Sequence, residues 1–160
     1  MLLTVTEQGR YGPRMPPVKK AKAATLLIVD DDAEIVGILR STLSRVGYQI
    51  VEALNGADAL ARAREAKPDV VLLDVMMPGK SGWEVAKDIR DDATLKSTGI
   101  IMLTAIGPKM NELTSPLYGV DDYLDKPFDF HELEARIAKV ITKRGGTPPT
   151  RPVKKPAKKK

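Results

Sequence analysis

Short apolar runs alternate with longer segments of helical periodicity through the middle of the chain. The apolar runs, rich in aliphatic and β-branched residues, lie at residues 25–30, 48–53, 69–74, 99–104 and 121–125. The segments with apolar residues at helical spacing lie at about 32–46, 56–66, 82–93, 108–118 and 129–142. This fivefold alternation predicts an α/β fold, a doubly wound five-stranded parallel sheet with helices on both faces.

Asp74 ends the run "DVVLLD", directly after four aliphatic residues that are suited to burial. A buried carboxylate is unfavourable unless it is paired, hydrogen-bonded or bound to a metal. Other polar groups also follow predicted strands: Asp30, Asp31 and Asp32 the first, Thr104 the fourth, and Lys126 the fifth. Because ligands of doubly wound sheets bind outside the carboxyl ends of the strands, we expect these groups to converge on one rim.

The residue types at this rim favour phosphoryl chemistry. Carboxylates held close together repel one another, and a hard divalent cation such as Mg²⁺ removes the repulsion. A cation with open coordination positions can also hold a phosphoryl group. Asp74 would then be a carboxylate nucleophile that forms an acyl phosphate. Lys126 would pair with one phosphoryl oxygen, and the Thr104 hydroxyl would donate a hydrogen bond to another.

Four segments, "LIVDDD", "LLDVMMPGKSG", "IIMLTA" and "DDYLDKPF", resemble the receiver domain of two-component response regulators, in order and over residues 25–142. The resemblance implies a flavodoxin-like receiver fold with Mg²⁺ as cofactor and Asp74 as phosphoacceptor. It implies a metal site made of Asp30, Asp31, Asp74 and the backbone carbonyl of Met76. It further implies Thr104 as switch hydroxyl, Tyr123 as switch aromatic, Lys126 as the family's active-site lysine, and a cis peptide between Lys126 and Pro127.

The function implied by the resemblance is that of a single-domain response regulator, a signalling receiver that is not an enzyme but catalyses its own phosphotransfer. A histidine kinase or phosphotransfer protein would supply the phosphoryl group, and a downstream protein would be the target. In the resembling family, the side chains two residues after the phosphoacceptor and the switch hydroxyl flank the approach of water to the acyl phosphate. Here they are Met76 and Ile106, which are apolar and cannot orient an attacking water, so the resemblance implies slow autodephosphorylation.

A hydrolase with an aspartyl intermediate, such as a haloacid-dehalogenase-like phosphatase, is a competing interpretation. That family has a second Asp two residues after its nucleophile, where this chain has Met76, so the sequence disfavours it.

Several other polar or aromatic residues have ordinary structural interpretations. Asp32 precedes a helical pattern and is expected to cap it. Ser81 and Glu84 have the spacing of a capping box. Trp83 is expected to pack and His131 to be solvated, while Pro116 is expected to end the fourth helix early.

The net charge of +5 conceals a segregation of charge along the chain. Residues 1–22 carry +4 and residues 143–160 carry +8, so the intervening residues carry −7. We expect a basic, Pro-rich disordered arm at 1–23, a receiver domain at 24–143 and a Lys/Pro-rich disordered tail at 144–160. The cluster "KKPAKKK" supports an alternative function, a phosphorylation-controlled protein that associates nonspecifically with nucleic acid through its tail. The plainer interpretation is a solvated tail that aids solubility.

The chain has no Cys, which excludes disulfides and thiolate chemistry. No apolar run is long enough to cross a bilayer, and the N-terminus lacks a signal-peptide core, so we expect a cytoplasmic protein without membrane insertion. Met15 is an alternative start site to Met1.

Overall fold

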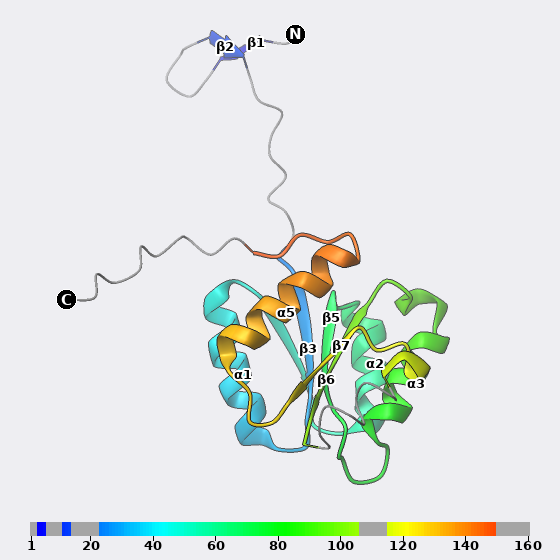
Figure 1. The fold of residues 1–160 in the computed structure, drawn as a ribbon. Coiled ribbons are helices and arrows are strands. Elements are labelled where there is room, and N and C mark those ends of the chain that lie inside the picture. The colour runs from blue at the N-terminus through cyan, green and yellow to red at the C-terminus, as the bar shows by residue number, and fades with distance from the viewer. Residues whose placement is uncertain (1–2, 6–10, 14–22, 106–114, 150–160) are drawn as a thin grey trace, which may run out of the picture.

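The computed structural model describes residues 3–5, 11–13, 23–105 and 115–149. Its main sheet has five parallel strands in the order β4-β3-β5-β6-β7 (Figure 1). The strands are β3 (Thr25–Val29), β4 (Gln49–Ala53), β5 (Val70–Asp74), β6 (Gly99–Thr104) and β7 (Asp122–Asp125). The prediction of a five-stranded parallel sheet is confirmed.

Helices cover both faces of this sheet, as predicted (Figure 1). They are α1 (Ala33–Val46), α2 (Gly56–Ala66), α3 (Gly82–Asp91) and α5 (Phe130–Lys143), with the 3₁₀ turns η1 (Ala93–Leu95) and η2 (Ser115–Tyr118). The helix expected at 108–118 falls largely on residues outside the described ranges, and its last part is η2.

Successive residues of the central strands pack on opposite layers. In β3, Leu26 and Ile28 lie in the core beneath α1 and α5, whereas Leu27 and Val29 lie in the core beneath α2 and α3. Both faces of each central strand are therefore buried, which explains why the sequence shows continuous apolar runs and no apolar–polar alternation.

Two helix starts follow the predicted capping. The Asp32 side chain accepts hydrogen bonds from the backbone N–H groups of Glu34 and Ile35 at the start of α1. Ser81 and Glu84 form the predicted capping box at the start of α3. These caps satisfy backbone donors that a helix start leaves unpaired, and they fix where each chain segment turns away from the sheet.

Outside this sheet, the strands β1 (Leu3–Val5) and β2 (Tyr11–Pro13) pair antiparallel. The sequence interpretation expected no regular structure in this segment. The remainder of residues 1–22, and residues 150–160, lie outside the described ranges. None of the helices within the described ranges has the length and hydrophobicity needed to cross a membrane.

The buried carboxylate of Asp121 joins several elements at the amino end of the sheet. It accepts hydrogen bonds from the Ile100 N–H at 2.9 Å, from Arg90 at 3.1 Å and from Arg144 Nη2 at 2.8 Å. Burial alone would raise the pKa of Asp121, but the hydrogen bonds and the charges of Arg144 and Arg90 outweigh it and lower the pKa. The ionised form of Asp121 therefore stabilises the fold.

We expect Asp121→Asn to lower the free energy of unfolding at neutral pH by about 2–4 kcal/mol, because the partly buried guanidinium groups of Arg90 and Arg144 lose their counter-charge. Since the pKa of Asp121 is lower in the folded state, this contribution is complete above about pH 5 and is lost as the pH falls through the folded-state value. Urea unfolding at several pH values should show the variant and the wild type converging in acid. The exposed Asp91→Asn is the control; an equal loss there, or a constant difference at all pH values, would contradict the assignment.

Candidate metal centre at the carboxyl end of the sheet

The carboxyl ends of the strands, at the lower edge of the sheet in Figure 1, bring four polar residues to one rim. Asp30 directly follows β3, Asp74 is the last residue of β5, Thr104 the last of β6, and Lys126 directly follows β7. Asp30, Asp74 and Thr104 are buried. Residues far apart in sequence thus share one site because the strands are parallel neighbours.

Asp30, Asp31 and Asp74 each offer a carboxylate oxygen, and these oxygens all lie within 4.8 Å of one another. Asp31 is exposed, whereas Asp30 and Asp74 are buried, so the cluster opens to solvent on one side. A compact set of carboxylate oxygens with one open side suits a hard cation such as Mg²⁺, which keeps several coordination positions for water or phosphate.

Lys126 forms ion pairs with two of these acids. Its ammonium donates to Asp30 Oδ2 at 3.0 Å and to Asp74 Oδ1 at 3.4 Å. The Lys126 backbone N–H donates to the Thr104 carbonyl at 2.8 Å, which fixes the lysine against the end of β6. The Lys126–Pro127 peptide is cis, as the resemblance implied.

The charges at this rim do not balance. Burial and the charge of Asp30 raise the pKa of Asp74, and Lys126 and the Met76 backbone N–H oppose this only in part. Burial would lower the pKa of Lys126, but its hydrogen bond to Asp30 and the charges of Asp30 and Asp74 raise it overall. One ammonium therefore serves two buried carboxylates, which leaves excess negative charge for a further cation.

The remaining predicted site residues lie around this group. Thr104 is fully buried, and the half-buried Tyr123 lies on the neighbouring strand β7 and packs against the core beneath α2 and α3. The Met76 side chain is 67% exposed, directly after the end of β5. Ile106 lies outside the described residues.

Trp83, Asp32 and His131 take the structural positions expected of them. The Trp83 ring packs against Tyr118 of η2 with 5.0 Å between centroids. The Asp32 side chain caps α1, and its backbone N–H also donates to Asp30 Oδ1 at 3.0 Å, so the cap helps to orient a site carboxylate. His131 is exposed in the first turn of α5.

Gly82 was not recognised from the sequence as a site residue. Its N–H donates to the Val75 carbonyl at 3.0 Å, and a Cβ added to it would lie 2.3 Å from the backbone oxygen of Asp74. The first turn of α3 can therefore approach the end of β5 only because residue 82 has no side chain. The sequence signal was a glycine directly after the capping serine.

An apolar groove beside Lys126 also went unrecognised. It has a volume of about 210 Å³ and is lined by Ile35, Ile38, Leu39, Lys126, Pro127, Phe128 and Phe130. Ile38 is 47% exposed there, and the rings of Phe128 and Phe130 meet edge to face at 5.8 Å. The groove places an apolar contact surface next to a charged site.

Comparison with known proteins finds that residues 26–138 match the sequence model of the response regulator receiver domain. The chain is 47% identical over 116 residues to a probable transcriptional regulator, ycf27, of Guillardia theta, covering 72% of this chain and 44% of the relative. It is 43% identical over 122 residues to the transcriptional regulatory protein ResD of Bacillus subtilis, covering 76% and 50%. The chain thus spans about half the length of these curated relatives.

Solved structures agree with the fold. A putative response regulator from Chloroflexus aurantiacus is 36% identical, with a TM-score of 0.71 over 76% of this chain and 99% of that one. The chemotaxis protein CheY4 of Vibrio cholerae is 34% identical, with a TM-score of 0.71 over 74% and 99%. The response regulator TrrA of Thermotoga maritima, solved in complex with Mg²⁺-BeF, is 38% identical, with a TM-score of 0.65 over 73% and 98%.

We expect Gly82→Ala to weaken Mg²⁺ binding and to lower the free energy of unfolding by about 1–3 kcal/mol, because the new Cβ must displace the end of β5 that carries Asp74. Calorimetric Mg²⁺ titration and urea unfolding measure the two effects. Gly37→Ala is the matched control: its Cβ would have only Arg40 nearby, at 3.9 Å, so stability should stay level or rise. Unchanged Mg²⁺ affinity in Gly82→Ala would show that the site does not depend on this close approach.

Proposed function

Because this chain belongs to the response regulator receiver domain family, we propose that it is a phosphorylation-controlled signalling protein whose phosphoacceptor is Asp74. The observation that carries the proposal is the shared ammonium of Lys126, bonded to both Asp30 and Asp74 within a cluster of three carboxylates. A structural ion pair would need one carboxylate for one ammonium, whereas a site that receives a cation and a phosphoryl group needs the excess of acid.

The phosphoryl donor is a phosphohistidine on a histidine kinase or phosphotransfer protein. An Asp74 oxygen attacks the phosphorus, the bond to the donor imidazole breaks, and an acyl phosphate forms as the imidazole leaves with the bonding pair. Lys126 moves from Asp74 to a phosphoryl oxygen while it keeps Asp30, and the Thr104 hydroxyl donates to another oxygen. Mg²⁺ held by Asp30, Asp31, Asp74 and the Met76 carbonyl would supply the charge that offsets the phosphoryl oxygens.

The output of the signal follows from the residues around Asp74. Thr104 is drawn toward the phosphoryl group, and the neighbouring Tyr123 repacks against the core beneath α2 and α3, which changes the surface offered to a downstream protein. Phosphate loss is slow, because the exposed Met76 side chain, two residues after Asp74, has no group that can orient water.

The apolar groove beside Lys126 is the docking surface of the protein donor. A donor helix that buries its apolar side chains against Ile38 and Phe128 would hold its histidine next to Lys126 and hence near Asp74. A small-molecule donor would not need this surface.

With Mg²⁺ and a small acyl phosphate or phosphoramidate donor, the chain should gain one phosphoryl group on Asp74, visible as a mass increase of the intact protein. Asp74→Asn should stay unlabelled, because an amide is a poor nucleophile. Asp31→Ala should label only at a higher Mg²⁺ concentration, because one hard oxygen ligand is removed. Labelling of Asp74→Asn equal to that of the wild type would refute the phosphoacceptor assignment.

The role of the groove in docking the protein donor can be tested separately from the labelling of Asp74. Ile38→Asp should slow phosphotransfer from a phosphorylated histidine phosphotransfer protein by about tenfold or more, because a charge replaces an apolar contact of about 1–2 kcal/mol. Labelling by the small-molecule donor should be unchanged. Leu117→Asp, at an 80% exposed residue of η2 outside the groove, is the control. Equal slowing by both variants, or slowing with the small donor, would argue against the groove as the docking surface.

A further inference from the structure

The outer edge of β4 carries backbone groups that the main sheet leaves unpaired. β4 is the first strand in the order β4-β3-β5-β6-β7, so β3 is its one neighbour among the described strands. The Gln49 N–H donates to the Ala24 carbonyl on the β3 side at 2.9 Å. Because alternate residues of a strand bond to the same neighbour, the N–H and C=O groups of Ile50 and Glu52 point away from β3. None of the described residues bonds these outward groups.

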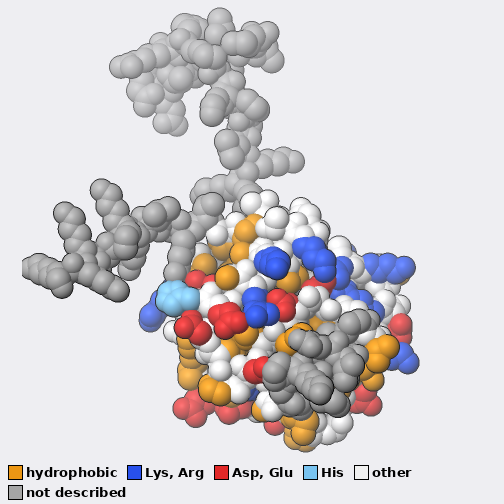
Figure 2. All heavy atoms as spheres, viewed as in Figure 1, with side chains coloured by type: hydrophobic (Ala, Val, Ile, Leu, Met, Phe, Trp, Pro, Cys, Tyr) orange, Lys and Arg blue, Asp and Glu red, His pale blue; other side chains and the backbone are white. Residues whose placement is uncertain are grey.

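The opposite edge of the sheet, β7, is covered by charged side chains. The Tyr123 N–H donates to Asp122 Oδ1 at 2.8 Å, and Arg136 donates to the Tyr123 carbonyl at 3.1 Å. Arg136 also pairs with Asp122 at 2.7 Å, which holds both side chains against the strand. Figure 2 shows Lys and Arg side chains beside Asp and Glu over β7 and α5. A further strand could pair there only by displacing these groups.

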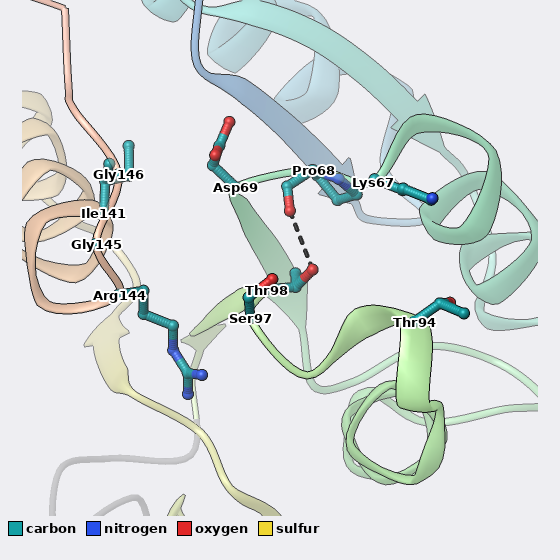
Figure 3. Close-up of a pocket in the computed structure, with 10 residues that line it drawn as sticks. All are labelled: Lys67, Pro68, Asp69, Thr94, Ser97, Thr98, Ile141, Arg144, Gly145 and Gly146. Atoms are coloured by element: carbon teal, nitrogen blue, oxygen red, sulfur yellow. Dashed lines mark hydrogen bonds between the residues drawn. The ribbon is translucent and has the colours of Figure 1, made fainter.

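Side chains also bond backbone carbonyls just before the strands β5, β6 and β7. The Thr98 hydroxyl donates to the Pro68 carbonyl at 3.0 Å (Figure 3). Arg90 donates to the carbonyls of Gly119 and Thr98, each at 2.7 Å. The edge of β4 has no such cover within the described residues. Its sequence, QIVEA, has neither Pro nor Lys, and its register with β3 runs without a bulge, so the usual protections of an edge strand are missing.

A groove of about 580 Å³ lies along this open edge. It is lined by Ile50–Leu54 and, at the start of α2, by Asn55, Asp58 and Arg62. Leu54 is 48% exposed there. Asp58 and Arg62 are exposed and form no ion pair with other described residues. The groove therefore combines open backbone groups, apolar side chains and unpaired charges of both signs.

The edge is complementary to itself in one antiparallel register. With Ile50 opposite Glu52 of a second copy, symmetry gives two hydrogen-bonded residue pairs. A register with Glu52 opposite Glu52 would put like charges together. A register with Ile50 opposite Ile50 would need the Tyr48 N–H, which already donates to the Leu43 carbonyl at 3.3 Å. The Ile50–Glu52 register also puts Val51 opposite Val51, an apolar pair on the face that carries α2.

The position of α2 suits a continuous sheet. This helix contacts both β4 and β3. Because neighbouring strands are about 4.8 Å apart, the α2 helices of two copies joined at β4 would lie about 10 Å apart, a normal distance for packed helices. They would run antiparallel, because a two-fold axis at Val51 reverses the direction of the chain.

The charges of α2 are arranged for the same axis. Val51 lies two residues, about 7 Å, before the end of β4, and Leu60 lies four residues, about 6 Å, after the start of α2. The two residues are therefore at about the same height, so Leu60 would lie at the axis. Asp58 and Arg62 are placed equally on either side of Leu60. Arg62 of each copy would then face Asp58 of the other.

We propose that two copies of this chain pair through the outer edges of β4, forming an antiparallel two-fold dimer with a continuous sheet. This proposal goes beyond phosphotransfer at Asp74 and does not depend on it. The interface consists of backbone hydrogen bonds between Ile50 and Glu52, the Val51 pair, and two ion pairs between Asp58 and Arg62. Because β3 separates β4 from β5, the carboxylate site stays outside the interface in both copies.

The test is sedimentation equilibrium of the full chain from about 1 µM to 1 mM, which should show a dimer that forms with rising concentration. Arg62→Glu should raise the dissociation constant about tenfold, because two acids then meet twice across the axis, and Asp58→Arg should do the same with cations. An equimolar mixture of the two variants should dimerise as the wild type does, because every pair across the axis is again of opposite sign. Lys87→Glu, at an exposed residue of α3, is the control and should change nothing.

The backbone pairing is tested by Glu52→Pro, which removes an outward N–H and none that bonds β3. It should prevent dimerisation, whereas Glu52→Ala, which keeps the N–H, should dimerise as the wild type does. Hydrogen exchange of the Ile50 and Glu52 amides should also slow about tenfold or more in the dimer, with the Tyr123 amide unchanged.

Three results would overturn the proposed dimer. A chain that stays monomeric up to about 1 mM would leave the edge to an extended segment of another protein or of this chain. A dimer that forms equally well in Arg62→Glu and Glu52→Pro would have its contact elsewhere. A mixture of Arg62→Glu and Asp58→Arg that dimerises no better than either variant alone would rule out the two-fold arrangement of α2.

Discussion

The structure depends on an unequal pairing at the end of its sheet, where two buried carboxylates, Asp30 and Asp74, share the single ammonium of Lys126. Buried charge without full compensation is unfavourable, and it persists only where the surrounding structure holds the groups in place. The backbone of Thr104 holds Lys126, and the N–H of Asp32 holds Asp30. The rim is thus a preorganised anionic site, and a bound divalent cation would relieve its charge imbalance.

The need to hold Asp74 in place also explains two features at the start of α3. The first turn of α3 must lie against the last residue of β5, and only a glycine at position 82 allows that approach. The capping box of Ser81 and Glu84 then fixes the start of α3 just there. Stabilising a helix start and positioning the Asp74 backbone are therefore achieved by consecutive residues, and a change in one is expected to disturb the other.

Much of this could be predicted from the sequence, because each central strand is buried on both faces and so appears as an unbroken apolar run. Once the runs are read as parallel strands, Asp30, Asp74, Thr104 and Lys126 must share a rim. The family resemblance is confirmed by the match of residues 26–138. The roles of the predicted site residues remain predictions: Asp30, Asp31, Asp74, Met76, Thr104, Tyr123 and Lys126. The partners of Asp121 could not be predicted, because Arg90 and Arg144 lie 31 and 23 residues from it and only the fold brings them together. The apolar groove beside Lys126 could not be predicted either, because Ile38 and Phe128 come from separate elements. The pairing of β1 with β2 was missed because three-residue strands are too short to show a period.

The length of the sheet limits how phosphorylation could affect its amino end. An added phosphoryl group brings about −1.5 to −2 charges to the rim at Asp74. The other end of β5 lies five strand residues away, a span of about 17 Å. The Debye length at physiological salt is about 8 Å, so the charge of a phosphoryl group on Asp74 is largely screened at the amino end. Any effect of phosphorylation on the amino end must therefore pass through a change in packing, such as that of Tyr123 in β7.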